Sequence, residues 1–312
     1  MTAIIATHDL TKEYGNARGI EGVTLEVAEG EVFGFLGPNG AGKTTMIRLL
    51  MALLHPTRGR AAISGLDCWA QATDVKRMVG YLPGEFTFDP SLRGAQIIAY
   101  LANLRGGVDR GYTRALIERL DLDPTRRFRD YSRGNKQKVG LVQAFMHRPR
   151  LLILDEPTSG LDPLNQQQFH ALVDEARRHG QTVFLSSHIL PEIEQTCDRV
   201  GIIRAGRLIK VDHVATLKAL KHQVVDIGFA APALPEWFAG VPGVETVAVA
   251  DGGLTLRLTV RQDLSAVLKV AARHDALSLN SREPSLEEVF LRFYTPAEAS
   301  PAPRDLVAAG ER

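Results

Sequence analysis

The chain is poor in cysteine, carries almost no net charge and has no long apolar run. Its 312 residues include only 2 cysteines, Cys68 and Cys197, whose isolated positions suit neither a disulfide framework nor a zinc site. This usage is typical of a reducing cytosol. The 37 lysines and arginines nearly balance the 36 acidic residues, so a net charge of +1 gives no electrostatic reason to expect nucleic acid or an acidic membrane surface as the main partner.

Membrane-spanning and secretory segments are also not expected. The longest apolar stretches, LLMALL from Leu49 and GLVQAFM from Gly140, are much shorter than the roughly 20 residues that a spanning helix needs. Near the start, Asp9 and Glu13 precede any apolar core of signal-peptide length. The length of 312 residues predicts one large domain and a smaller one, or two of ordinary size.

The stretch GPNGAGKTT, residues 37–45, has the G-x-x-x-x-G-K-[ST] spacing of a phosphate-binding loop. An apolar run from Glu31 predicts a buried strand before it, and TMIRLLMALL predicts a helix after it. Glycines let backbone N–H groups approach an anion, and the helix N-terminus adds positive charge, so we expect a polyphosphate here. The alternative is a glycine-rich turn without a ligand. The expected binding residues are Gly37, Asn39, Gly40, Ala41, Gly42, Lys43, Thr44 and Thr45.

Two further apolar runs end in polar residues. LLILDEP ends a predicted buried strand in Asp155 and Glu156, and open α/β sheets bind ligands at such strand ends. We expect Asp155 to hold Mg²⁺ together with the Thr44 hydroxyl, and Glu156 to polarise an attacking water. FLSSH ends another strand in His188, whose imidazole could reach a γ-phosphate oxygen. Acids that merely end a strand, and a structural histidine, are the alternatives.

The order of predicted elements indicates a mainly parallel α/β core. Strand-rich segments come first, helical periodicity dominates from about 89 to 150, and the core is complete by about residue 220. We therefore expect a first domain at 1–220, a small domain at 221–295 and a flexible, Pro- and Ala-rich tail at 296–312.

The small domain is predicted to contain strand, helix, strand, strand, helix, strand and helix, the order of a split βαβ fold. One helix is expected at LPEWFAGV, residues 234–241, and the last at SLEEVFLRFY, residues 285–294. Ser285 and Glu288 have the spacing of a capping box at the start of that last helix.

The segment YSRGNKQKV, from Tyr131, is similar to the signature sequence L-S-G-G-Q of ATP-binding cassette ATPases, with Ser132 and Gly134 at the second and fourth positions. Alone, it would be an ordinary Ser-capped helix start. Together with GPNGAGKTT, LLILDEP, SGLD at residues 159–162 and the histidine after FLSS, it gives a resemblance to that family over roughly residues 4 to 215.

The resemblance implies a P-loop NTPase cassette, with a mainly parallel core sheet, an antiparallel β subdomain and a helical subdomain, followed by a small α/β domain. Its substrate is ATP with Mg²⁺. In the family the signature of one copy closes over the ATP of another, which assigns Ser132 and Gly134 to a partner's nucleotide. Asp162 of SGLD is also implied to bind nucleotide. Tyr14, by itself a surface tyrosine, becomes the adenine-stacking residue. The implied catalytic residues are Lys43, Glu156 and His188.

YSRGNKQKV and the C-terminal REPSLEEVFLRFY specifically resemble the ATPase subunits of bacterial multidrug and antibiotic exporters of the daunorubicin-resistance type. This implies a homodimer docked on separate transmembrane permease subunits at the cytoplasmic face of the membrane, with no nucleic acid partner. Two other functions remain open: a soluble cassette ATPase that acts on ribosomes or DNA, and an import ATPase whose C-terminal domain binds a small effector.

One motif departs from the family pattern. The family usually carries Gln after YLP, whereas this chain has Gly84 followed by Glu85. A glycine has no side chain with which to contact magnesium or water. The Glu85 carboxylate could substitute at the metal, or it could face the membrane subunit and pair with a basic residue there.

Overall fold

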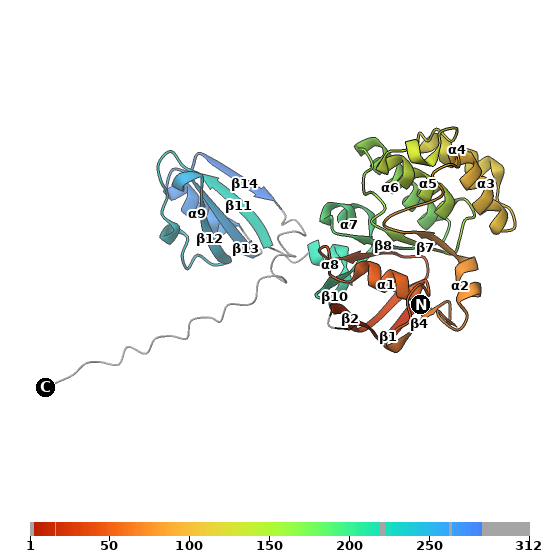
Figure 1. Cartoon of the computed structure of the whole chain (residues 1–312). Coiled ribbons are helices and arrows are strands. Elements are labelled where there is room, and N and C mark those ends of the chain that lie inside the picture. The colour runs from red at the N-terminus through yellow and green to blue at the C-terminus, as the bar shows by residue number, and fades with distance from the viewer. Residues whose placement is uncertain (1–2, 16, 219–221, 262–263, 283–312) are drawn as a thin grey trace. The chain divides into compact units, whose positions relative to one another are not determined.

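The computed structural model describes residues 3–15, 17–218, 222–261 and 264–282. The chain divides into two compact units, Met1–Val214 and Ala215–Arg312, and Figure 1 shows their elements. The first unit ends slightly before the boundary expected at about residue 220. The segment 296–312 lies outside the described residues.

The first unit contains two sheets and most of the helices. Its strands are β1 (Ala3–Tyr14), β2 (Ala17–Ala28), β3 (Val32–Leu36), β4 (Arg58–Ile63), β5 (Leu66–Asp67), β6 (Val79–Leu82), β7 (Leu151–Asp155), β8 (Thr182–Ser187), β9 (Arg199–Arg204) and β10 (Arg207–His213). Its helices are α1 (Lys43–Leu50), α2 (Ala72–Met78), α3 (Gly94–Leu104), α4 (Arg110–Arg119), η1 (Phe128–Asp130), α5 (Arg133–Phe145), α6 (Pro163–Arg178) and α7 (Leu190–Thr196). Helix α8 (Val214–Lys218) follows at the boundary between the units.

The six-stranded sheet has the order β10-β9-β3-β8-β7-β6 and is parallel except for β10. The second sheet, β2-β1-β4-β5, is antiparallel. The predicted α/β cassette fold is therefore confirmed. Strands β3 and β7 are buried along their whole length, as the continuous apolar runs in the sequence indicate. The carboxyl ends of β7 and β8 consequently meet at one edge of the sheet.

The main core lies between these two sheets and includes α1. Phe33 and Phe35 of β3 point into it, and both rings pack on Phe184 of β8. Gly34 lies between them on the strand and so faces the opposite side. A Cβ atom built at Gly34 would come within 2.7 Å of Ile193 and 3.0 Å of Cys197, so the absence of a side chain lets α7 pack directly on the strand.

Helices α3, α4 and α5 form the insertion between β6 and β7 (Figure 1). Helix α5 packs on β6 and brings its first turn near the site described below. Among the described residues, none of the helices combines the length and apolarity required to span a bilayer.

The second unit is built on one antiparallel sheet. Its elements are β11 (His222–Gly228), η2 (Pro235–Trp237), β12 (Val244–Ala250), η3 (Asp251–Gly253), β13 (Thr255–Arg261), α9 (Ser265–Arg273) and β14 (Ser278–Arg282). The strand order β12-β13-β11-β14 is that of a split βαβ arrangement. Phe238 and Val267 are completely buried between the sheet and the segments that cover it.

The helix predicted at residues 234–241 is wrong. Only Pro235–Trp237 form a single 3₁₀ turn, and Gly240 adopts a left-handed φ of 77° that ends any helical continuation. Trp237 instead stacks on His274 with ring centroids 4.1 Å apart. The predicted helix at 285–294, with Ser285 and Glu288, lies outside the described residues.

The close packing of α7 on β3 can be tested with Gly34→Ala. The added methyl would overlap Ile193 and Cys197, so we expect a loss of about 1–3 kcal/mol in the free energy of unfolding. Gly111→Ala is the matched control, because Gly111 is exposed in α4 and its nearest atom would be Asp109 Oδ1 at 3.3 Å. The control should be neutral or stabilising. Equal urea midpoints for Gly34→Ala and the wild type would contradict the packing argument.

Candidate active site

The predicted phosphate-binding loop forms the turn between β3 and α1. Gly40 and Gly42 have φ values of 78° and 109°, a region that disfavours side chains. A Cβ atom at Gly42 would also lie 2.7 Å from the Ile20 side chain. The loop encloses a cavity of about 360 Å³ at the N-terminus of α1. The residues lining it are Pro38, Asn39, Gly40, Gly42, Lys43, Thr44, Thr45 and Glu156.

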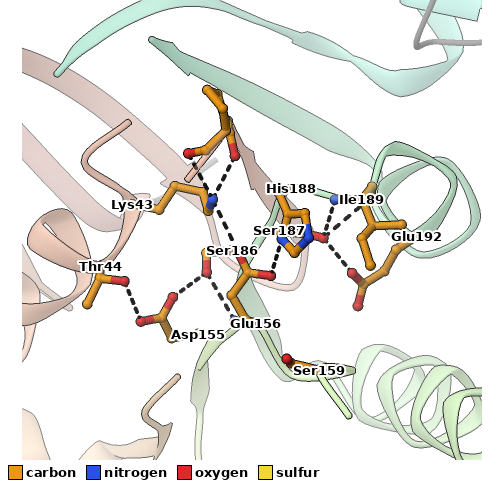
Figure 2. A network of polar contacts seen from close by, with 12 residues as sticks. Lys43, Thr44, Asp155, Glu156, Ser159, Ser186, Ser187, His188, Ile189 and Glu192 are labelled. Carbon is orange, nitrogen blue, oxygen red and sulfur yellow. Dashed lines mark hydrogen bonds and ion pairs between the residues drawn. The ribbon is translucent and has the colours of Figure 1, made fainter. Parts of the chain in front are cut away.

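Lys43 is buried, and its ammonium group is held from several sides. The Nζ atom donates hydrogen bonds to the carbonyl oxygens of Gly37 at 2.6 Å and Pro38 at 3.3 Å. It also forms an ion pair with Glu156 Oε1 at 3.1 Å. An ammonium group has three hydrogen-bond donors, so these three acceptors match its capacity. Figure 2 shows the lysine directed at the end of β7.

Thr44 and Asp155 lie side by side, as predicted for a metal site. The Thr44 hydroxyl donates to Asp155 Oδ2 at 2.9 Å, and the Ser186 hydroxyl donates to Asp155 Oδ1 at 2.5 Å. One carboxylate and one hydroxyl oxygen are hard ligands that suit Mg²⁺. Mg²⁺ is usually bound by one or two carboxylates together with substrate phosphates, and this pair has such a composition.

Glu156 lies one residue beyond β7, in a left-handed conformation with φ of 50°. Such backbone costs about 1–3 kcal/mol for a residue other than glycine and occurs often at functional sites. The Glu156 amide is fixed by the Ser186 carbonyl at 3.2 Å and the Ser186 hydroxyl at 3.1 Å. Its carboxylate is divided between Lys43 and His188 Nδ1, which is 2.7 Å from Oε2. Glu156 lines the P-loop cavity, and His188, which was expected to reach a γ-phosphate oxygen, contacts Glu156 but is not among the lining residues.

The signature segment and the SGLD loop pack against each other. A Cβ atom at Gly134 would lie 2.4 Å from the Gly160 carbonyl oxygen, so only glycine fits. Arg133 Nη2 donates to the Ser159 hydroxyl at 2.7 Å. Ser132 caps α5, because its hydroxyl accepts a hydrogen bond from the Asn135 amide at 3.2 Å.

Asp162 caps the next helix, α6. Its Oδ1 accepts from the Asn165 amide at 2.9 Å and its Oδ2 from the Asn165 side chain at 2.7 Å. These hydrogen bonds stabilise the ionised form and lower the pKa of Asp162. Ser132, Gly134 and Asp162 do not belong to the residues that line the P-loop cavity. Within the chain, the structure therefore gives Ser132 and Asp162 helix-capping roles.

Tyr14 is exposed at the end of β1 and does not line the P-loop cavity. Its ring lies under the Lys12 ammonium, with Nζ 5.6 Å from the ring centroid. A Cβ atom at Gly19 would be 3.0 Å from the Tyr14 ring, and one at Gly42 would be 3.2 Å from the Gly19 carbonyl. Tyr14 thus lies close to Gly19, which in turn lies close to Gly42 of the P-loop.

Gly84 lies beside the predicted metal ligands, whereas Glu85 lines another cavity. A Cβ atom at Gly84 would be 3.2 Å from Asp155 Oδ2. The exposed Glu85 borders a cavity of about 460 Å³ together with Arg133 and Lys136 of the first turn of α5. The lining of this cavity thus includes one carboxylate and two cationic side chains.

Two residues that hold Glu156 were missed by the sequence analysis. Ser186 bonds both Asp155 and Glu156, and Gln137 Nε2 donates to the carbonyls of Glu156 and Pro157, both at 3.2 Å. The serine pair in FLSSH was a possible signal. That signal could be interpreted only with knowledge of the strand register, which places Ser186 opposite Asp155.

Two family models match the chain. Residues 20–159 match the ABC transporter family, and residues 216–294 match the C-terminal domain of DrrA1-3-like ATP-binding proteins. The second match covers most of the second compact unit, including residues beyond those that the structure describes.

Curated relatives and solved structures agree with these matches. The chain is 33% identical to the bacitracin transport ATP-binding protein BcrA of Enterococcus faecalis, over 94% of this chain and 97% of that protein. It is 36% identical to the daunorubicin resistance ATP-binding protein DrrA3 of Streptomyces coeruleorubidus, over 90% of this chain and 93% of that protein. A solved ATP-binding subunit of an ABC transporter aligns with a TM-score of 0.64 and 29% identity, over 69% of this chain and 92% of that one.

A fold likeness extends to a dimeric ATP-binding cassette solved in a post-hydrolysis state with ADP and phosphate, with a TM-score of 0.61 and 21% identity over 67% of this chain and 98% of that one. Given the P-loop, the paired acids of β7 and near-complete coverage of its relatives, this chain belongs to the ATP-binding proteins of ABC transporters.

Proposed function

We propose that this chain is the ATP-hydrolysing subunit of a membrane exporter for antibiotics or other hydrophobic compounds. ATP hydrolysis is the activity of the family, and bacitracin transport and daunorubicin resistance are named for relatives aligned over nearly their whole length. The hydrolytic part of this proposal rests on one observation. Glu156 contacts both Lys43 and His188, and it lies beside the Thr44–Asp155 pair.

Phosphate binding would be performed by the P-loop. Residues 38–40 and 42–45 line the cavity at the positive end of α1, and Lys43 supplies a full positive charge. Thr44 and Asp155 would hold Mg²⁺, which neutralises charge on the phosphates. Tyr14, close to the P-loop through Gly19, would stack on the adenine ring.

Water activation would be performed by Glu156. Its carboxylate can accept a proton from the attacking water as the oxygen–phosphorus bond forms. Phosphate oxygens compete with Glu156 Oε1 for the Lys43 ammonium, so nucleotide binding would weaken the ion pair and leave the carboxylate available to water. His188 Nδ1, at 2.7 Å, would fix the orientation of the other carboxylate oxygen.

A second copy of the chain would complete each site. Ser132, Gly134 and Asp162 would contact the ATP held by the partner's P-loop, so that ATP closes a homodimer around two nucleotides. This closure would drive separate transmembrane permease subunits, with the ATPase bound at the cytoplasmic face of the membrane.

Co-purification tests the exporter assignment. The tagged chain, expressed in its native host and extracted with mild detergent, should bring down a multi-span membrane protein without a substrate-binding protein. The control is the same chain with Lys43→Ala, which should retain the permease because the P-loop is not the docking surface. Recovery of ribosomal RNA or DNA as the stoichiometric partner would overturn the proposal.

Glu156→Gln tests the catalytic base. The amide cannot accept the proton, so kcat for ATP should fall by about 10²-fold or more. Loss of the charge that competes for Lys43 should leave ATP affinity equal or higher, and a dimer should accumulate with ATP. Steady-state hydrolysis, equilibrium ATP binding and size-exclusion chromatography measure these effects. The exposed Glu236→Gln in the second unit is the control and should behave as wild type. Wild-type turnover by Glu156→Gln would exclude Glu156 as the base.

Mixed dimers test the composite sites. Lys43→Ala damages the P-loop of its own chain, and Ser132→Arg damages the signature that serves the partner. A heterodimer of the two then contains one doubly damaged site and one intact site, whereas each homodimer contains two damaged sites. Mixing the inactive variants should restore measurable hydrolysis, about half of the wild-type rate per heterodimer and about a quarter for a randomly reassorted equal mixture, if the sites act independently. The absence of any recovery in verified heterodimers would contradict the assignment of Ser132 to the partner's ATP.

A further inference from the structure

A buried carboxyl group lies at the start of α7, behind the candidate active site. Glu192 is 6% exposed, and its Oε2 accepts a hydrogen bond from the Ser187 hydroxyl at 2.5 Å. Burial is the main cause that raises the pKa of Glu192, whereas side-chain hydrogen bonds with Ser187 and Thr158 lower it. A buried carboxyl group is costly without such hydrogen bonds, so Glu192 depends on the hydroxyl groups around it.

The hydrogen bonds of Glu192 lead to the turn that carries His188. The Ser187 oxygen donates to Glu192 and accepts from the Ile189 amide at 2.9 Å. Ser187 is completely buried, whereas the side chain of His188 is 43% exposed. The turn is thus anchored by the residues on both sides of the histidine, as Figure 2 shows.

The other end of this chain of contacts is the catalytic carboxylate. His188 Nδ1 lies 2.7 Å from Glu156 Oε2. Holding an exposed imidazole in one orientation costs conformational entropy. A fixed backbone keeps the histidine in place, so this cost is limited to its side chain. Glu192 does not line the P-loop cavity, so it can influence the reaction only through its neighbours.

We propose that Glu192 is a positioning residue, which holds the Ser187–Ile189 turn through the Ser187 hydroxyl and thereby keeps His188 against Glu156. This inference rests on the proposed function, because it concerns hydrolysis at the same site. It gives α7 the role of holding the turn that carries His188, a role that the P-loop, the acids of β7 and the signature segment do not share.

The first experiment compares Glu192→Ala, Glu192→Gln and Ser187→Ala in the full-length chain. Loss of the anchor displaces His188, so kcat for ATP should fall by about tenfold or more in both alanine variants. The ATP dissociation constant should stay within about twofold, because the P-loop contacts are intact. Glu192→Gln keeps an oxygen that can accept from Ser187 and should restore kcat to within about threefold of wild type. Glu194→Ala, on the same helix, is the matched control and should not change kcat.

The second experiment repeats Glu192→Ala and Ser187→Ala in a His188→Ala background. If the anchor acts through the histidine, neither should lower kcat further once His188 is gone. A further loss equal to that seen with His188 present would show a merely structural role and overturn the proposal. If Glu192→Ala fails to fold, Ser187→Ala removes the same link with a smaller change and carries the test.

Two results separate this inference from the proposed function. Wild-type turnover by His188→Ala would overturn the positioning role but leave hydrolysis at this site in place. No ATPase activity in the wild-type chain, alone or with its permease, would instead overturn the proposed function.

Discussion

The pairing of β7 with β8 is the constraint on which the site depends. The parallel register places Asp155 opposite Ser186, and Ser186 then bonds both the Asp155 carboxylate and the Glu156 amide. A slip of one residue would turn Asp155 to the other face of the sheet. The register is fixed by β7, which is buried and apolar up to Asp155, and by Phe184, which packs on the two aromatic rings of β3. Hydrophobic packing thereby sets the geometry of the hydrophilic site.

The charges of the site are arranged as one connected set. Lys43 is the buried cation, and Glu156 is shared between it and His188. The left-handed backbone of Glu156 aims its carboxylate back over the P-loop rather than along the strand. Phosphate oxygens that reach Lys43 would weaken its ion pair with Glu156, because they compete for the same ammonium group. In the proposed mechanism, nucleotide binding and the release of Glu156 would therefore be coupled through Lys43.

Local patterns in the sequence predicted the parts of the site that are local. The P-loop is contiguous, and the strand ends at Asp155 and His188 follow apolar runs, so their chemistry could be predicted without knowing the fold. Contacts between distant segments could not. The Ser186–Asp155 bond and the Gln137–Glu156 bond depend on strand register and on where α5 docks.

The second unit shows how a local pattern can mislead. Residues 234–241 have helical composition, yet Gly240 ends the turn and Trp237 gains a stacked partner in His274. Tertiary packing of an aromatic side chain outweighed a weak helical preference, which is the usual outcome for short segments. Strand β13 was easier to predict, because its residues alternate in burial.

The departure at Gly84 leaves no side chain at the position beside Asp155. The glycine lies against Asp155, where only its backbone can take part, and the next side chain, Glu85, shares a cavity with Arg133 and Lys136. Both cations lie in the first turn of α5, where the helix dipole disfavours positive charge. In this chain, the loop after β6 therefore borders the same cavity as the first turn of the signature helix, and Gly84 brings no side chain to Asp155.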